Sequence, residues 1–280
     1  MKVLIAPDKF KGSLDAIKVC QAIEEALDES GKQIQSISIP MADGGEGTCD
    51  MLTQFSKGKK ITVEALDPFF RPIQGEYGIS GDGKTAFVEM ANVSGLQRLK
   101  PEERNALLGT TYGTGQLIAA ALDQGVQSII MGVGGSATND AGIGMAEALG
   151  AKFYDSSENQ LKPIGQNLKS VQRIDVQNIH PRVKDVSVVA ICDVSNPFYG
   201  IQGAAHVFAP QKGASPEVVK FLNDGLVNFA SVVKRQFGLD INFPGAGAGG
   251  GLGGGAKVFF NIEFRSGIEF IMDFIGLETL

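Results

Sequence analysis

Two acidic side chains lie among glycines in PMADGGEGT, residues 40–48. Asp43 and Glu46 could hold a metal ion, orient a substrate, or place negative charge at the start of a helix expected over residues 48–55. The spacing D-x-[DN]-x-[DN]-G is absent, which excludes a dedicated calcium loop. The stretch follows a predicted strand, and its glycines let the backbone approach a ligand closely. We therefore interpret it as a substrate-side wall of a cleft, with Asp43 at the cleft edge.

A second group of charged residues follows the first predicted strand, KVLIAP. In PDKFKG, residues 7–12, the candidates are Asp8, Lys9 and Lys11. A lysine at a strand end can hold a carboxylate or a phosphate as a point charge. We interpret Lys9 as a solvated surface residue. If the first two strands are parallel neighbours, Lys11 and Asp43 face the same edge of the cleft.

A glycine-rich turn, GVGGSATNDAGIG, covers residues 132–144 between a predicted strand and a predicted helix. Such a turn directs backbone N–H groups and a helix N-terminus at an anion, so it favours a phosphate site. It is not a Walker A loop, because G-x-x-x-x-G-K-[ST] occurs nowhere in the chain. The alternative is a tight turn capped by Asn139 or Asp140, although its small polar residues exceed what capping needs. The candidate phosphate contacts are Gly134, Gly135, Ser136, Thr138, Asn139, Asp140 and, further along the chain, Lys212.

One further carboxylate, Asp193, follows the apolar strand predicted over residues 185–192. Ligands of open α/β sheets bind at the carboxyl ends of strands. Asp193 could therefore accept a proton from a substrate hydroxyl or hold Mg²⁺. It could equally form an Asx-turn before the Asn196-Pro197 pair, and the sequence leaves both interpretations open. The glycine run at 245–256 lacks the preceding strand and following acidic residue of a dinucleotide site, so it is a flexible loop, a close helix contact or a phosphate cover.

Composition narrows the class of protein. The 280 residues carry a net charge of −6 and show no basic stripe, which argues against nucleic-acid binding. Three cysteines without a C-x-x-C pair argue against a disulfide framework or a zinc site. No run of 18 apolar residues is present, so we expect no membrane span and a cytoplasmic protein.

The order of predicted elements indicates an α/β fold with two α/β domains around a cleft. Strands alternate with helices in residues 1–66, which predicts a parallel, Rossmann-like sheet that includes a third strand, KKITVEAL. The first helix is expected to begin at an N-cap, Ser13. A hairpin turning at Asp82-Gly83 then begins the second domain, residues 67–280, with a mixed sheet.

Six motifs together resemble the bacterial type I glycerate kinases (glycerate 2-kinases). They are APDKFKGSL, PMADGGEGT, TAFVEMANVSGL, TTYGTGQLI, GVGGSATNDAGIGMAEALG and CDVSNPFYGIQGAAHVFAPQKGA. They occur in the order of that family and span most of the chain. The resemblance implies transfer of the ATP γ-phosphoryl group to glycerate, giving 2-phosphoglycerate or the 3-phospho isomer. It also implies a Rossmann-like domain assembled from both ends of a longer chain, so we expect the C-terminal half of that domain to be absent here.

For the implied reaction, we assign each candidate residue a role from its chemical type and its place at a predicted strand end. We expect the 134–140 turn and Lys212 to hold the ATP phosphates, with Asp193 near Mg²⁺. Asp8, Lys11 and Glu46 would bind the substrate, Lys11 through the glycerate carboxylate. Asp43 or Asp193 would accept the hydroxyl proton. The expected partners are glycerate and ATP, without nucleic acid or membrane, and a homodimer stays open. The alternatives are another small-acid kinase, a phosphatase, or an inactive or truncated homologue that binds a small anion or nucleotide without turnover.

Overall fold

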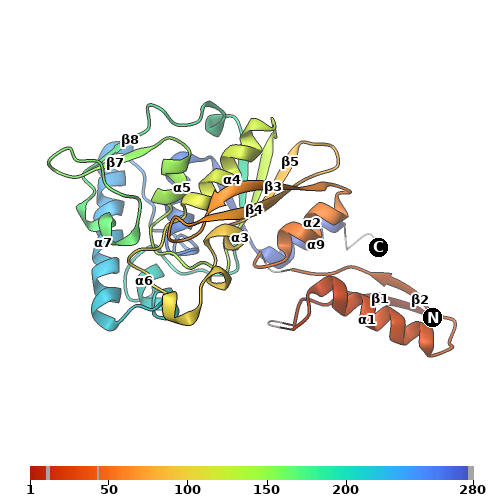
Figure 1. Cartoon of the computed structure of the whole chain (residues 1–280). Helices are drawn as coiled ribbons and strands as arrows, with labels where there is room; N and C mark the ends of the chain where they lie inside the picture. The colour runs from red at the N-terminus through yellow and green to blue at the C-terminus, as the bar shows by residue number, and fades with distance from the viewer. Residues whose placement is uncertain (11–12, 43, 277–280) are drawn as a thin grey trace.

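The computed structural model describes residues 1–10, 13–42 and 44–276 of the chain, and its centre is a six-stranded mixed sheet (Figure 1). The strand order is β10-β9-β6-β5-β4-β3. Strands β5, β6, β9 and β10 are parallel to one another, and β4 runs antiparallel to both of its neighbours, β5 and β3. The strands are β3 (Lys59–Leu66), β4 (Pro72–Ile79), β5 (Thr85–Glu89), β6 (Ser128–Gly132), β9 (Ser187–Ile191) and β10 (Ile262–Arg265). The four parallel strands therefore end at one edge of the sheet.

Both faces of this sheet are covered. Within β5, Val88 belongs to the main hydrophobic cluster, whereas the neighbouring Phe87 belongs to a second cluster on the opposite face. The second cluster is completed by α2 and α9, and α4 packs on the main-cluster face. The helices are α2 (Thr48–Phe55), α3 (Met90–Ser94), α4 (Tyr112–Asp123), α5 (Ile143–Ala148), α6 (Ala204–Phe208), α7 (Pro216–Phe237), α8 (Leu252–Phe259) and α9 (Gly267–Ile275). Two further strands, β7 (Lys152–Tyr154) and β8 (Arg173–Asp175), pair antiparallel in a small sheet of their own.

The first three elements form a separate N-terminal unit, which projects from the main body in Figure 1. It consists of β1 (Lys2–Ile5), α1 (Ala16–Glu29) and β2 (Gln35–Ser38), and the two strands pair in parallel as expected. Helix α1 begins two residues later than predicted. Its N-cap is Asp15, whose Oδ1 accepts a hydrogen bond from the N–H of Lys18 at 2.8 Å, and not Ser13. A carboxylate at the N-cap satisfies an otherwise unpaired N–H group of the first turn.

The assignment of KKITVEAL to the first sheet is wrong. This strand, β3, pairs antiparallel with β4 along its whole length, from Lys59 opposite Ile79 to Leu66 opposite Pro72. Its polar and apolar residues alternate, which is typical of an antiparallel strand with one face toward solvent and not of a buried parallel strand. Helix α2 also packs on the large sheet. A domain boundary at residue 67 stays a prediction that these contacts do not favour, and we propose a boundary between β2 and α2 instead.

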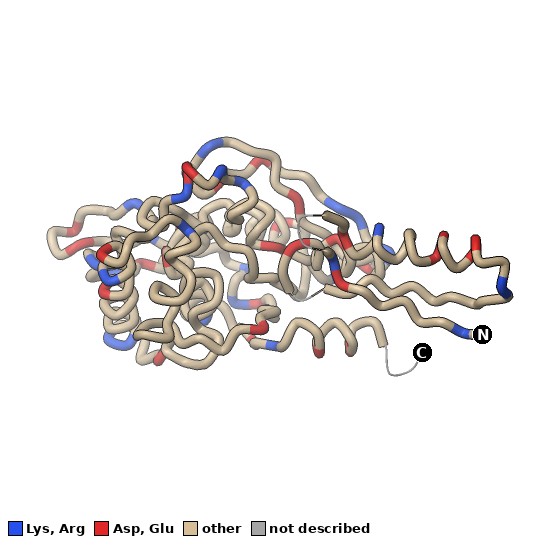
Figure 2. Tube along the Cα trace, turned by 90° about the horizontal axis from the view of Figure 1, so that it is seen from below, with Lys and Arg blue, Asp and Glu red and all other residues tan. Residues whose placement is uncertain are grey.

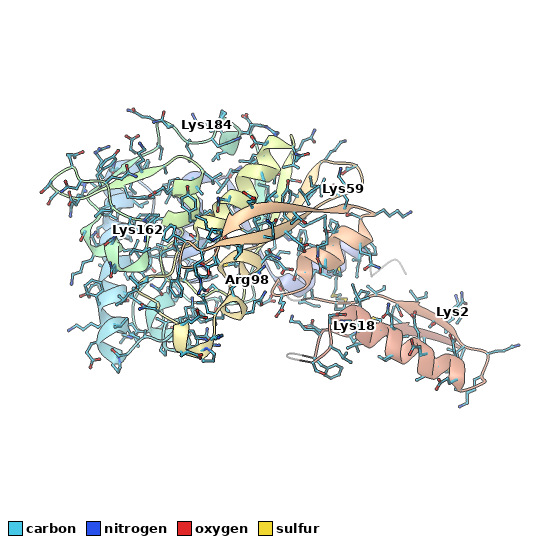
Figure 3. The ribbon with its side chains drawn as sticks, in the orientation of Figure 1. Lys2, Lys18, Lys59, Arg98, Lys162 and Lys184 are labelled. Atoms are coloured by element: carbon cyan, nitrogen blue, oxygen red, sulfur yellow. The ribbon has the colours of Figure 1, made fainter. Side chains whose placement is uncertain are left out.

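Charges are dispersed over the described part of the chain. Figure 2 shows acidic and basic positions interspersed along the trace without a basic stripe. The basic residues labelled in Figure 3 are exposed and come from different parts of the chain. None of the helices within the described ranges is long and apolar enough to cross a membrane.

Candidate active site

The parallel strand ends open into a cavity of about 360 Å³, which we call the main cavity. Its lining includes three segments at strand ends: 44–46 after β2, 133–136 after β6, and 191–194 at the end of β9. Lys9 approaches it from the N-terminal unit. This is the position at which an open α/β sheet binds ligands, because the loops that follow parallel strands converge there.

A second cavity of about 330 Å³ lies against the N-terminal unit, and we call it the N-terminal cavity. Asp8 lines it together with apolar side chains, and Lys9 and Glu46 line both cavities. The two cavities therefore meet at a basic and an acidic side chain. Lys11 and Asp43 lie outside the described residues, so their predicted meeting at the cleft edge stays a prediction.

Lys9 does not fit the interpretation of a solvated surface residue. Its side chain is only 19% exposed, and its Nζ lies 3.5 Å from Oδ1 of Asp8, which also accepts the N–H of Lys9. Since Lys9 lines both cavities, it is a candidate contact for an anionic ligand that the sequence interpretation missed. A signal was present, because Lys9 comes directly after Asp8 in the loop that follows the first strand.

The glycines of two loops allow close backbone contact at the floor of the main cavity. A Cβ atom on Gly132 would lie 2.5 Å from the carbonyl oxygen of Gly44, and one on Gly134 would lie 3.1 Å from Cα of Gly45. Any larger residue at Gly132 would separate the loops. These contacts explain why glycine occupies the positions at which the two loops meet.

The predicted phosphate contacts fall into two groups. Gly134, Gly135 and Ser136 line the main cavity. Thr138 and Asn139 are fully buried behind that wall, and no described residue or its backbone hydrogen-bonds the Thr138 hydroxyl or the Asn139 amide group. The first group is placed to meet a ligand directly, whereas the second can contribute only through the packing of the loop.

Asp140 joins the starts of two helices. Its Oδ2 accepts hydrogen bonds from the backbone N–H and the hydroxyl of Thr111, at 2.7 and 2.8 Å, next to the start of α4. The backbone N–H groups of Gly142 and Gly144, at the start of α5, also donate to its carboxylate. Burial raises the pKa of Asp140, and these hydrogen bonds oppose that rise. The contacts of Asp140 therefore agree with the alternative interpretation of this turn, in which Asp140 is a capping residue.

Lys212 contacts the glycine-rich loop from behind. Its side chain is 1% exposed, and Nζ donates to Oγ of Ser136 at 2.6 Å and to the carbonyl oxygen of Thr138 at 2.5 Å. Burial lowers the pKa of Lys212 to about 7, and the charge of Asp140 opposes that shift. The ammonium group thus holds the 136–138 segment in place next to the main cavity. The neighbouring Gln211 lines the cavity itself.

Asp193 is exposed at the mouth of the main cavity. Its Oδ1 accepts hydrogen bonds from the N–H of Gly267 at 2.8 Å and the hydroxyl of Ser266 at 2.9 Å, so it caps the start of α9. Among the described residues, Oδ2 has no hydrogen-bond partner. The carboxylate is thus fixed by one oxygen while the other can face a ligand.

The donors around the main cavity fit a magnesium ion bound with a substrate phosphate. Mg²⁺ is usually held by one or two carboxylates together with phosphate oxygens, not by a closed cage of protein ligands. Asp193 and Glu46 supply two carboxylates to one cavity. Within the described ranges, no cluster of three or more His, Cys, Asp or Glu side chains could hold a metal without such help.

The glycine run at 245–256 belongs mostly to the packing of α8. A Cβ atom on Gly250 would lie 2.0 Å from the carbonyl oxygen of Thr138, and one on Gly255 would lie 1.7 Å from that of Ala141. Of this run, Ala248 and Gly249 line the main cavity. The close-contact alternative therefore accounts for most of these glycines.

Taken together, the strand-end cavity, the exposed glycine backbone and the paired carboxylates define an α/β protein suited to a small anionic ligand. A sequence model of the glycerate kinase family matches residues 3–280, and the chain belongs to that family. A glycerate kinase of Haemophilus influenzae is 46% identical over 278 residues, which cover 99% of this chain and 74% of the relative. A glycerate 2-kinase of Escherichia coli K12 is 43% identical over 279 residues, covering 99% and 73%.

The fold agrees with this assignment. A crystal structure from Salmonella typhimurium LT2, described provisionally as a glycerate kinase 2, superposes with a TM-score of 0.92 at 41% identity. The match covers 100% of this chain and 75% of that one. The resemblance stated from the six motifs is confirmed, as is the mixed α/β fold class.

Proposed function

We propose that the protein transfers the γ-phosphoryl group of ATP to the C2 hydroxyl of glycerate, giving 2-phosphoglycerate and ADP. Membership of the glycerate kinase family supports the substrate, and the name of the Escherichia coli relative supports the 2-phospho product over the 3-phospho isomer. The observation that carries the proposal is a single cavity that joins a glycine-rich backbone wall to two carboxylates at parallel strand ends.

In this proposal the phosphates of ATP lie along the wall formed by Gly134, Gly135 and Ser136. Backbone N–H groups in such a turn stabilise negative charge without the cost of ordering long side chains. Lys212 keeps the wall in place through its hydrogen bonds to Ser136 and the backbone at Thr138. Phosphoryl transfer depends mainly on positioning and charge neutralisation, so a rigid wall is a direct contribution to rate.

The substrate side is formed by the N-terminal unit. Asp8 and Glu46 border the N-terminal cavity, and Lys9 stands between the two cavities. We assign the carboxylate of glycerate to the lysines of this side, Lys9 and the predicted Lys11. The hydroxyl oxygen then faces the main cavity, where it forms the new P–O bond as the bond between the γ-phosphorus and the bridging oxygen breaks.

Asp193 is the residue that we place at the reacting atoms. Its free Oδ2 can accept the proton released by the attacking hydroxyl, with Asp43 as the alternative acceptor. Glu46 would hold Mg²⁺, together with Asp193 where Asp43 is the proton acceptor, and the bound ion would supply charge neutralisation for the phosphate oxygens. The location in the cytoplasm and any homodimer stay predictions.

Replacement of Asp193 by asparagine tests this assignment. Asp193→Asn keeps an oxygen that can accept from Gly267 and Ser266, so the cap of α9 survives while the charge is lost. We expect kcat to fall by about 100-fold or more, the range for loss of a proton acceptor. The control Ser266→Ala removes one cap partner but keeps the carboxylate, and it should leave kcat within about twofold of wild type. Near-normal turnover by Asp193→Asn would remove this residue from the mechanism.

A further inference from the structure

Glu89 is a buried carboxylate at the carboxyl end of β5, and the sequence interpretation gave it no role. Its side chain is 8% exposed, and Oε1 accepts a hydrogen bond from the N–H of Cys49 at 2.5 Å. The N–H of Gly47 also favours the charged form of this carboxylate. Gly47 is the N-cap of α2 and offers no side-chain cap of its own. Glu89, at the end of strand β5, therefore takes the place of a local side-chain cap for helix α2.

The segment held by Glu89 is the wall of both cavities. Residues 44–46 line the main cavity, and Glu46 lines the N-terminal cavity as well. Glu89 lies directly behind this segment, since a Cβ atom on Gly132 would contact both the Gly44 carbonyl oxygen and, at 3.6 Å, Cγ of Glu89. Glu89 itself lines neither cavity.

The surroundings of Glu89 disfavour the ionised form of its carboxyl group. The nearby titratable groups are the carboxylates of Glu46 and Asp50 and the thiol of Cys49, and no ion pair to Glu89 is present within the described ranges. Burial raises the pKa of Glu89 to about 7, while the N–H groups of Cys49 and Gly47 oppose that rise. Ionising a buried carboxylate without a cationic partner costs stability, so such a residue is an unusual choice for a purely structural cap.

We propose that Glu89 is a positioning residue, which binds the Gly47 and Cys49 N–H groups and so fixes the 44–47 loop in the orientation that receives glycerate. The inference rests on the proposed function for its substrate, but the anchoring itself is independent of any reaction. Without the carboxylate, the start of α2 loses its cap, and Glu46 and the Gly44–Gly45 backbone lose a fixed position relative to Gly132 and Gly134.

Amide hydrogen exchange tests the anchoring without any substrate. In Glu89→Ala, the amides of Gly47 and Cys49 should exchange at least tenfold faster than in wild type, while those in the centre of β6 keep their protection. Glu89→Gln preserves the packing and one acceptor oxygen, so it should give an intermediate rate and guards against a folding defect. The matched control is Glu147→Gln, because burial also raises the pKa of Glu147 to about 7 but this residue lies on α5, away from the loop. Unchanged exchange at Gly47 and Cys49 in both Glu89 variants would overturn the proposal.

The pH dependence of glycerate use distinguishes positioning from simple stabilisation. An ionised carboxylate accepts N–H hydrogen bonds more strongly than a protonated one, so the wild type should gain in kcat/KM for glycerate, relative to Glu89→Gln, between pH 6 and pH 8. We expect this ratio to change by at least fivefold. Lys212 titrates in the same range in both proteins and cancels in the ratio. A constant ratio would overturn the positioning role. Absence of turnover in the wild type would contradict the proposed function and leave the exchange result to decide the anchoring.

Discussion

At the scale of single residues, one buried acid and one buried base hydrogen-bond to the two glycine-rich segments that border the main cavity, residues 44–47 and 134–138. Glu89 lies behind the 44–47 loop and Lys212 lies behind the 134–138 loop. Burial moves the pKa of each group to about 7, upward for the acid and downward for the base. The hydrogen bonds that hold both segments should therefore change in strength with pH near neutrality.

The effect of Lys212 on stability follows from its lowered pKa. The folded protein releases this proton near pH 7, whereas the unfolded chain keeps it up to about pH 10.4. The unfolded state thus binds more protons between these values, and the free energy of unfolding contributed by this group rises across the window. This contribution to the free energy of unfolding is fully present above the pKa of the unfolded state and is lost as the pH falls to the folded-state pKa of about 7.

Lys212→Met should remove this rise. We expect the difference in Tm between wild type and Lys212→Met to grow in favour of wild type from pH 7 to pH 9, measured by thermal unfolding with circular dichroism. The exposed Lys220 on α7 provides the control, and Lys220→Met should track wild type at every pH. A pH-independent difference for Lys212→Met would show that the group keeps an ordinary pKa in the folded protein.

At the scale of elements, local signals in the sequence were sufficient for most of the framework. The helix expected over 48–55 is α2, and the hairpin turning at Asp82-Gly83 joins β4 to β5. Each rests on residues that are close in the chain: hydrophobic periodicity in the first case and a turn pair in the second.

Pairing between distant elements was less predictable. The alternation in KKITVEAL did favour an antiparallel strand, but the predicted order of elements placed it in the wrong sheet. The roles of Lys212 and Asp140 depend on contacts with Ser136 and Thr111, which are far away in the chain. A side chain that reaches a cavity and one that braces it from behind have the same sequence signal, namely a polar residue near a strand end.

The contact between loops gives a prediction for glycine. Gly44 and Gly47 both have positive φ, 85° and 91°, so alanine at either position costs about 1 kcal/mol of backbone strain. A Cβ atom on Gly44 would also lie 2.4 Å from Cγ2 of Ile191, whereas one on Gly47 meets nothing within 4 Å. Overpacking adds about 1–3 kcal/mol in the first case only.

Gly44→Ala should therefore lower the free energy of unfolding more than Gly47→Ala does. It should also raise KM for glycerate by about tenfold, because the loop must move away from Ile191. Urea unfolding and steady-state kinetics of the two variants provide the comparison. Equal effects of the two substitutions would show that the 44–47 loop is not packed on the end of β9.

At the scale of the whole molecule, the site is formed between the N-terminal unit and the large sheet. Lys9 comes from the first, Asp193 and Ser136 come from the second, and Glu46 belongs to the segment that connects them. The sequence motifs could assign these residues to one family, but motif order carries no information about which of them share a cavity. The structure supplies that grouping and relates it to the ends of β6 and β9.

The most direct test of the account is to identify the product. The protein is incubated with ATP, Mg²⁺ and glycerate and followed by proton-coupled ³¹P NMR. A phosphate on C2 couples to one hydrogen and gives a doublet, whereas a phosphate on C3 couples to two hydrogens and gives a triplet. We predict ADP together with a new phosphomonoester doublet. A triplet would contradict transfer to C2, and binding of ATP and glycerate by calorimetry without any new phosphomonoester would contradict the kinase activity itself.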